Sequence, residues 1–128
     1  VNMKVSEVSK KYDISADTLR YYEKIGLIKN VPRNKSGIRD YDENALKRIE
    51  FIKCMRSAGV EIEILIKYMN LLEKGKKTVL ERKNLLSEQK NKLLEKQKSI
   101  SSTLDRLDYK ISLYDEIIEG KRKDFTEE

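Results

Sequence analysis

The segment ISADTLRYYEKIGLI, residues 14–28, predicts a short helix with two chemically different faces. Ser15 can cap this helix by accepting a hydrogen bond from a backbone N–H of the first turn, and Gly26 can end it. Helical spacing turns the apolar side inward and places polar and aromatic side chains on the other side. The inward set is Leu19, Tyr22 and Ile25, and the outward set is Asp17, Arg20, Tyr21 and Lys24.

A second short helix is expected just upstream of this segment. Val5, Val8 and Tyr12 recur on one helical face, and the stretch YDIS at 12–15 interrupts the pattern. Two short helices joined by a tight turn predict a helix-turn-helix. An outer face rich in donors and carrying an aromatic ring suits the major groove of DNA, where arginine reads guanine or holds a phosphate.

Residues 26–42, GLIKNVPRNKSGIRDYD, predict a small β-hairpin with a basic tip. Leu27 and Ile28 can start the first strand, and residues 38–41 can form the return strand. The residues between them favour a turn, namely Pro32, Asn34, Ser36 and Gly37. The hairpin would act as a positively charged wing that carries Arg33, Lys35 and Arg39.

Two further helices are expected, over residues 43–57 and about 61–74. Asp42 can cap the first of them, Gly59 can end it, and Gly75 can end the second. Their apolar residues recur at helical spacing and should face inward; these are Leu46, Ile49, Ile52 and Met55, then Ile62, Leu65, Met69 and Leu72.

Residues 76–119 contain neither glycine nor proline and repeat apolar residues every seven positions, which predicts a coiled-coil helix. The predicted seam consists of Val79, Leu86, Leu93, Ile100, Leu104, Leu107, Ile111, Tyr114 and Ile118. Three further seam positions are polar instead: Lys83, Lys90 and Gln97. A lone helix cannot bury such a stripe, so the pattern implies a second copy of the chain. The fold class is therefore mainly α, with a head over 1–75, a dimerisation helix over 76–119 and a frayed tail over 120–128.

Composition restricts the function. The chain has a net charge of +6, and residues 1–41 carry 9 Lys and Arg against 5 Asp and Glu, so an acidic partner such as DNA is favoured. No apolar run reaches the roughly 18 residues of a membrane span, and we expect a cytoplasmic protein without a membrane partner. With one cysteine and no histidine, neither a metal site nor a cofactor is expected. The absence of a nucleophile–base constellation argues against an enzyme.

The runs TLRYYEKIGLI (18–28) and SGIRDYDENALKRIEFIKCMRSAGVEIEILIKYM (36–69) resemble the MerR family of bacterial transcription regulators. The resemblance implies a winged helix-turn-helix head and two extra helices, joined through an antiparallel coiled coil in a homodimer. It also implies binding to a pseudo-palindromic operator in a promoter with an over-long spacer. Activation would follow from bending and untwisting that spacer, so that RNA polymerase engages both promoter elements.

Carried over by position, the resemblance assigns DNA contacts to the second helix and to the wing. The residues concerned are Ser15, Thr18, Arg20, Tyr21, Lys24, Lys35, Arg39 and Tyr41. Two positions depart from the family pattern. Ile38 stands where a tyrosine usually follows the wing glycine, and Glu61 stands where a serine-type cap is common.

Cys54, in FIKCMRSAG, is the candidate sensor. A cysteine here, with a short coiled-coil tail, is similar to the AdhR/NmlR-like subgroup, whose members respond to aldehydes and other thiol-reactive electrophiles. Lys53 and Arg56 are neighbours in sequence that could favour a thiolate. The alternative is that Cys54 is an inert packing residue, because free cysteine is among the most buried residue types.

Two other functions remain open at this point. The same DNA-binding regulator could respond to a small molecule bound non-covalently. The chain could instead be a structural DNA-bridging protein without an effector, and a salt-sensitive but sequence-insensitive affinity for DNA would support that function.

Overall fold

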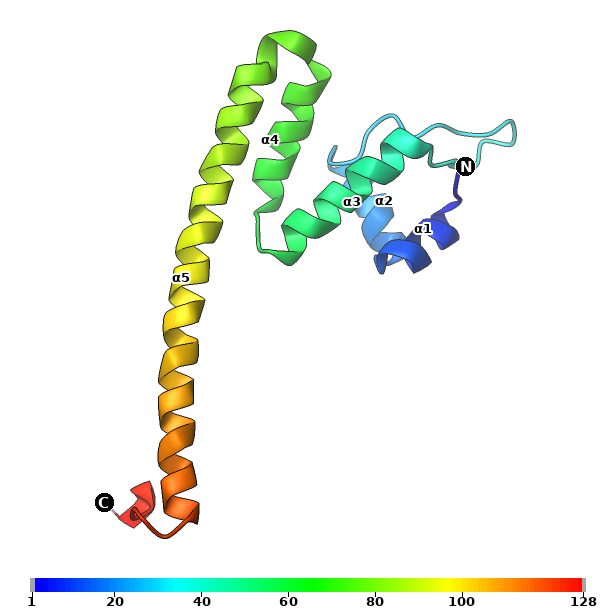
Figure 1. The fold of residues 1–128 in the computed structure, drawn as a ribbon. Helices are drawn as coiled ribbons and strands as arrows, with labels where there is room; N and C mark the ends of the chain where they lie inside the picture. The colour runs from blue at the N-terminus through cyan, green and yellow to red at the C-terminus, as the bar shows by residue number, and fades with distance from the viewer. Residues whose placement is uncertain (1, 128) are drawn as a thin grey trace. The chain divides into compact units, whose positions relative to one another are not determined.

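The computed structural model describes residues 2–127 and is mainly α-helical (Figure 1). It divides into two compact units, one ending at Leu86 and one beginning at Ser87. The first unit therefore includes the first turns of the long helix and ends at Leu86, whereas the sequence predicts a boundary at residue 75. The elements in the described residues are α1 (Val5–Tyr12), α2 (Ala16–Lys24), α3 (Glu43–Ser57), α4 (Ile62–Glu73), η1 (Gly75–Thr78), α5 (Val79–Ile118) and η2 (Phe125–Glu127).

The helix-turn-helix forms where the sequence predicts it. The turn between α1 and α2 passes through Asp13, whose φ of 53° is left-handed, and Ser15 then caps α2. Val8 on α1 and Leu19 on α2 are fully buried, so the two helices meet through the apolar faces that helical spacing predicted. This packing leaves the opposite face of α2 uncovered by the rest of the head.

The wing differs from the predicted β-hairpin. Arg33 and Arg39 form an isolated antiparallel bridge, and residues 2–127 contain no longer strand ladder there. Leu27 and Ile28 were expected to start a strand, but they are buried in a loop, and both backbone N–H groups donate to the Tyr22 carbonyl. Their apolar character thus serves the core of the head, and a strand prediction for them is wrong.

α3 and α4 supply most of the remaining core of the first unit. Asp42 caps α3 by accepting from the Ala45 N–H at 2.9 Å, whereas Glu61 makes no side-chain cap on α4. The buried residues on the two helices are Ala45, Leu46, Ile49 and Ile52, then Leu65, Met69 and Leu71. Leu71 is buried in place of the predicted Leu72, because the chain turns into η1 immediately after this point and Thr78 donates back to the Leu71 carbonyl at 2.7 Å.

The long helix α5 spans 40 residues. Along it, Val79, Ile100, Leu104, Leu107, Ile111, Tyr114 and Ile118 are exposed, and Ile118 reaches 81%. Leu86 and Leu93 are half-buried. The stripe that the heptads predict is therefore largely uncovered in a single chain, and the homodimer itself stays a prediction.

The segment after α5 is ordered back onto the helix. Gly120, with φ 79°, turns the chain, and the Phe125 ring lies 5.2 Å from the Tyr114 ring in an edge-on arrangement. The Lys110 Nζ lies 3.8 Å from the centre of the same ring. Phe125 thus contacts the last turns of α5, and the frayed tail expected over 120–128 stays a prediction. No helix among the described residues is long and apolar enough to cross a membrane.

Truncating a fully buried residue of α3 should destabilise the first unit. We expect Ile52→Ala to lower the free energy of unfolding by about 2–5 kcal/mol, because it removes buried methyl groups and leaves a cavity. The exposed Lys47→Ala on the same helix is the matched control and should change the free energy by no more than about 0.5 kcal/mol. Urea unfolding at one protein concentration measures both; equal effects would contradict this assignment of the core.

Candidate nucleic-acid interface

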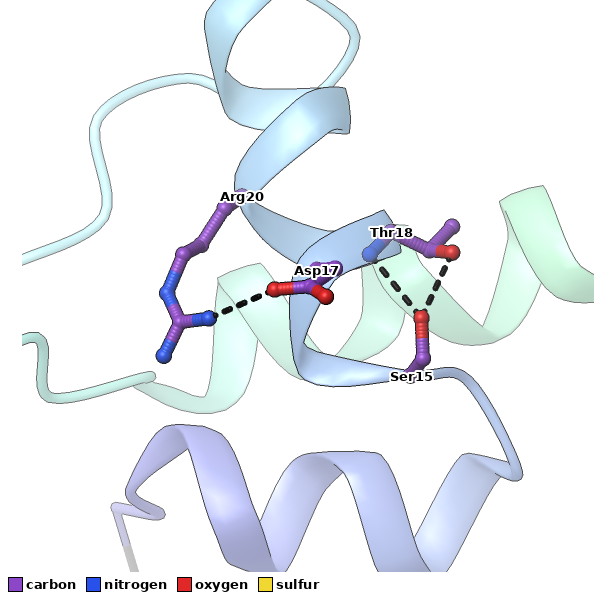
Figure 2. A network of polar contacts seen from close by, with 4 residues as sticks. All are labelled: Ser15, Asp17, Thr18 and Arg20. Atoms are coloured by element: carbon purple, nitrogen blue, oxygen red, sulfur yellow. Dashed lines mark hydrogen bonds and ion pairs between the residues drawn. The ribbon is translucent and has the colours of Figure 1, made fainter.

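The start of α2 is held by a compact polar network (Figure 2). The Ser15 Oγ accepts from the Thr18 backbone N–H at 3.0 Å and donates to the Thr18 Oγ1 at 2.8 Å. This cap satisfies a backbone donor that a helix start otherwise leaves unpaired. Ser15 and Thr18 were both predicted to face DNA. In the structure their hydroxyls are hydrogen-bonded to each other. Both residues therefore stabilise the first turn of α2, which lies at the surface.

Arg20 projects from the outward face of α2. Its Nη1 donates to the Asp17 Oδ1 at 3.0 Å, and 54% of the side chain stays exposed (Figure 2). Because Asp17 is almost wholly exposed, water screens the pair and it stabilises the fold little. The contact engages one guanidinium nitrogen, and the remaining N–H groups are available to an acceptor. The contact with Asp17 therefore orients the Arg20 side chain and leaves its other N–H groups able to bind an acceptor.

Tyr21 and Lys24 complete this face. Tyr21 is 53% exposed, and its ring centre lies 6.4 Å from that of Tyr22, which is half-buried as expected for an inward residue. Lys24 is exposed. The outward face predicted for α2 is therefore present as an exposed surface that carries Arg20, Tyr21 and Lys24.

The wing is attached to α2 by an ion pair. The Arg39 Nε donates to the Glu23 Oε2 at 2.7 Å, and both side chains are only 25% exposed. Arg39 was predicted to contact DNA phosphates. Its Nε instead binds Glu23, so in this structure it holds the wing against α2, and only its remaining nitrogens could reach a phosphate.

The wing tip is shaped by Asn34 and Gly37. The Asn34 Oδ1 accepts from the backbone N–H groups of Ser36 and Ile38, and Gly37 has φ 79°, which favours glycine. The Arg33 Nη1 donates to the Gly37 carbonyl at 2.9 Å and braces the tip. Lys35 is exposed there, as predicted.

Tyr41 does not lie where the sequence places it. It is 1% exposed, and its backbone pairs with that of Met3 through hydrogen bonds of 2.8 and 2.9 Å. The structure therefore makes Tyr41 a packing residue that ties the chain start to the end of the wing, and it does not support a side-chain contact with DNA. Burial raises the pKa of Tyr41, and the nearby Glu23 carboxylate raises it further, against a lowering by Arg39.

A basic groove lies between the start of α1, the outer side of α2 and the wing. Its volume is about 490 Å³, and its lining includes four cationic residues and no acidic ones. The lining residues are Lys4, Val5, Ser6, Ala16, Arg20, Arg33, Gly37, Ile38 and Arg39. Lys4 was missed by the sequence analysis, although its place directly before the first helix was a usable signal. The groove joins the two predicted DNA-facing elements into one positively charged surface.

Cys54 is exposed near the end of α3, which counts against the alternative that it is a buried packing residue. Its cationic neighbours each donate a hydrogen bond to a backbone carbonyl, and their effect on the thiol stays a prediction. The Lys53 Nζ donates to the Asp13 carbonyl at 3.2 Å, and the Arg56 Nη1 donates to the Val60 carbonyl at 2.9 Å. Because a backbone carbonyl carries no net charge, both side chains keep their positive charge in these contacts. What the structure shows for Cys54 itself is that a reagent has access to the thiol.

The raised pKa of Tyr41 predicts a pH effect on stability. Since burial holds the folded pKa above the ordinary value of 10.0, the stabilisation is complete below that value and is lost as pH rises through the folded pKa. Tyr41→Phe cannot ionise, so between about pH 8 and pH 11 its free energy of unfolding should fall less than that of the wild type. Urea titrations at both pH values measure this. Tyr109→Phe, on an exposed ring, is the control and should follow the wild type.

Comparison with known proteins places the chain in a family. The family model described as "MerR HTH family regulatory protein" matches residues 3–72. The regulator AdhR of Bacillus subtilis (strain 168) is 56% identical over 81 residues, which are 63% of this chain and 58% of that protein. The chain thus spans little more than half the length of that relative.

Solved structures agree over nearly the whole chain. A Listeria monocytogenes protein assigned to the MerR family superposes with a TM-score of 0.87 at 42% identity, over 93% of this chain and 91% of the other. HiNmlR, described as a MerR family regulator lacking the sensor domain and bound to promoter DNA, superposes with a TM-score of 0.84 at 27% identity, over 91% and 92%. These relatives are regulators rather than enzymes, and they match the subgroup that the sequence resembles. The chain belongs to the MerR family of helix-turn-helix regulatory proteins.

Proposed function

We propose that this protein binds a pseudo-palindromic promoter operator as a homodimer and activates transcription by bending and untwisting the DNA. The observation that carries the proposal is the continuous basic surface made by the outward face of α2, the groove beside it and the wing tip. It is supported by the similarity to HiNmlR, which is described as bound to promoter DNA.

The side chains on this surface are suited to two kinds of DNA contact. Cations at the wing and groove, such as Lys4, Arg33 and Lys35, suit phosphate contacts, which position a protein on DNA without reading sequence. Arg20 and Tyr21 project from a helix that fits the major groove, where arginine pairs with guanine and apolar edges meet thymine methyl groups. Recognition of sequence is therefore assigned to α2 and positioning to the wing.

The exposed stripe of α5 supports the homodimer. Two heads joined through such a stripe would bind two half-sites at a fixed spacing. Deforming the DNA to match that spacing costs a free energy of a few kcal/mol. A DNA deformation of this size is enough to change how RNA polymerase binds the two promoter elements while the regulator stays bound. RNA polymerase is thus an indirect partner, reached through promoter geometry.

We further propose that an aldehyde or similar electrophile triggers activation at Cys54. The exposed thiol gives such a reagent access, and similarity to AdhR supports the subgroup. In the step proposed, the Cys54 Sγ adds to the carbonyl carbon of the aldehyde and the thiol proton ends on the carbonyl oxygen. The resulting hemithioacetal enlarges a side chain beside the α3–α4 turn, and its formation needs no further reactant.

Removing the guanidinium of Arg20 should weaken binding to the operator. We expect Arg20→Ala to weaken binding to the DNA upstream of this gene by about 1–3 kcal/mol and to relax base preference at one position of each half-site. Arg106→Ala, which removes an exposed arginine from α5, is the matched control and should bind as the wild type does. Fluorescence anisotropy at fixed salt measures both; an unchanged affinity for Arg20→Ala would remove it from the contacts.

The trigger is tested by transcription in vitro from the same promoter, with and without a reactive aldehyde. We expect the aldehyde to raise transcription several-fold with the wild type and to have no effect with Cys54→Ala, while both bind the operator equally. An equal response of the two proteins would instead favour a non-covalent effector. A response from neither would leave DNA binding standing and remove support for the electrophile.

A further inference from the structure

The last turn of α4 carries an acid where a helix disfavours one. Glu73 is the final residue of α4, and that turn contains no basic residue. The C-terminal end of a helix carries a partial negative charge, so a carboxylate there is destabilising unless a cation lies beside it. The cation is Lys29, which lies 44 residues earlier in the chain, in the loop that follows α2. This departure from a local rule therefore marks a contact between distant segments.

Four side chains join this loop to α4, and we call them the α4 clamp: Lys29, Asn30, Asn70 and Glu73. The Glu73 Oε2 accepts from the Lys29 Nζ at 3.2 Å, and its Oε1 accepts from the Asn30 Nδ2 at 3.3 Å. The Lys29 Nζ also donates to the Asn70 Oδ1, about one turn earlier on α4. Because both oxygens of the carboxylate are engaged, the clamp restrains the direction of the Glu73 side chain as well as its distance from the loop.

The loop holds the two clamp donors close to the end of α2. Two backbone N–H groups of the loop donate to the Tyr22 carbonyl on α2, at 2.9 and 3.2 Å. Gly26 has a φ of 81°, and a Cβ built there would lie 3.3 Å from the Lys29 Cε, so a larger residue would crowd the lysine stem. Asn30 has a φ of 57°, in the left-handed region that asparagine tolerates. The clamp donors are therefore attached to α2 by a constrained loop.

The same end of α4 is tied to the start of α5. The Thr78 Oγ1 donates to the Leu71 carbonyl at 2.7 Å and accepts from the Arg82 Nε at 3.0 Å. The Arg82 Nη2 donates to the Gly75 carbonyl at 3.3 Å. Thr78 is 5% exposed, so its hydrogen bonds are sheltered from water. The last turn of α4 is thus held from two sides, by the loop after α2 and by the first turn of α5.

We propose that Lys29 and Glu73 are positioning residues for DNA binding, because the α4 clamp fixes α2 relative to the start of α5. This inference rests on the homodimer of the proposed function, in which the α5 helices join the two heads. The distance between the two copies of α2 then depends on the clamp in each chain. The clamp therefore sets how far apart two half-sites must lie to be bound together.

The clamp and the wing contact have different roles. The ion pair between Arg39 and Glu23 holds the wing on α2, within one DNA-facing surface. The α4 clamp instead holds that surface against the part of the chain that leads to the other copy. Loss of the clamp should leave the contacts of one head with its half-site intact. It should increase the tolerance for half-sites at other distances, because a loosely attached head can adjust to them.

A spacing experiment tests this role. Fluorescence anisotropy at one salt concentration measures the Kd for the promoter DNA upstream of this gene and for two derivatives, with the half-sites one base pair closer together or further apart. One base pair moves a half-site by about 3.4 Å along the DNA axis. We expect the wild type to bind both derivatives at least about tenfold more weakly than the natural DNA, whereas Glu73→Gln and Lys29→Met should lose no more than about threefold.

The matched control is Glu63→Gln, which removes the same charge from an exposed position of the same helix and should keep the wild-type spacing preference. The Lys29 and Glu73 side chains are 32% and 38% exposed, so their ion pair stabilises the fold little and both variants should stay folded. Urea unfolding of each protein measures this. A clamp variant that is folded and keeps the wild-type spacing preference would overturn the inference.

Exchanging the charges tests the contact itself. We expect Lys29→Glu and Glu73→Lys each to relax the spacing preference, and the double variant to return to within about threefold of the wild-type ratio of Kd values. This rescue also keeps the test decisive if a single variant fails to fold, because the restored contact should restore both folding and spacing preference. A double variant no better than either single variant would overturn the pairing.

Failure of the homodimer is distinguishable from failure of the clamp. A monomer mass in light scattering, with no spacing preference in the wild type, would overturn the homodimer and this inference with it. A dimeric wild type with a clear spacing preference that the clamp variants share would overturn this inference alone.

Discussion

The DNA-facing surface depends on the ion pair between Glu23 and Arg39. Glu23 lies on α2 and Arg39 on the wing; their charged atoms are 2.7 Å apart, and both side chains are three-quarters buried. A charge-assisted contact in this setting is stronger than an exposed one, and it sets where the wing stands relative to α2. Tyr41 and Met3 add an antiparallel backbone bridge at the end of the wing. A short loop with almost no strand structure thereby becomes a fixed part of the head.

Positive charge and exposed apolar surface are concentrated in different parts of the chain. The positive charge is concentrated in the head, whereas α5 carries a mixed-charge surface and a long apolar stripe. In the proposed homodimer this stripe would join two heads at a set distance. The proposed activation by DNA deformation requires such a fixed spacing.

Local chemistry made part of the structure predictable. The caps at Ser15 and Asp42 and the exposed face of Arg20, Tyr21 and Lys24 follow from neighbours within one or two helical turns. The burial of Tyr41 and the ion pair of Arg39 could not be predicted in this way, because their partners, Met3 and Glu23, are distant in sequence. For the same reason the apolar residues Leu27 and Ile28 resembled the start of a strand, although they are buried in the core of the head. The position of Lys4 directly before the first helix was a signal, but its place in the basic groove depends on residues of α2 and the wing that are distant in sequence.

We infer that the protein activates transcription by correcting the geometry of its promoter. Transcription in vitro from the natural promoter and from a version with a shortened spacer tests it most directly, using RNA polymerase with and without the regulator. We expect the regulator to activate only the natural promoter, because the shortened promoter should already be active without it. Equal stimulation of both promoters would contradict it and would point to recruitment of polymerase by direct contact.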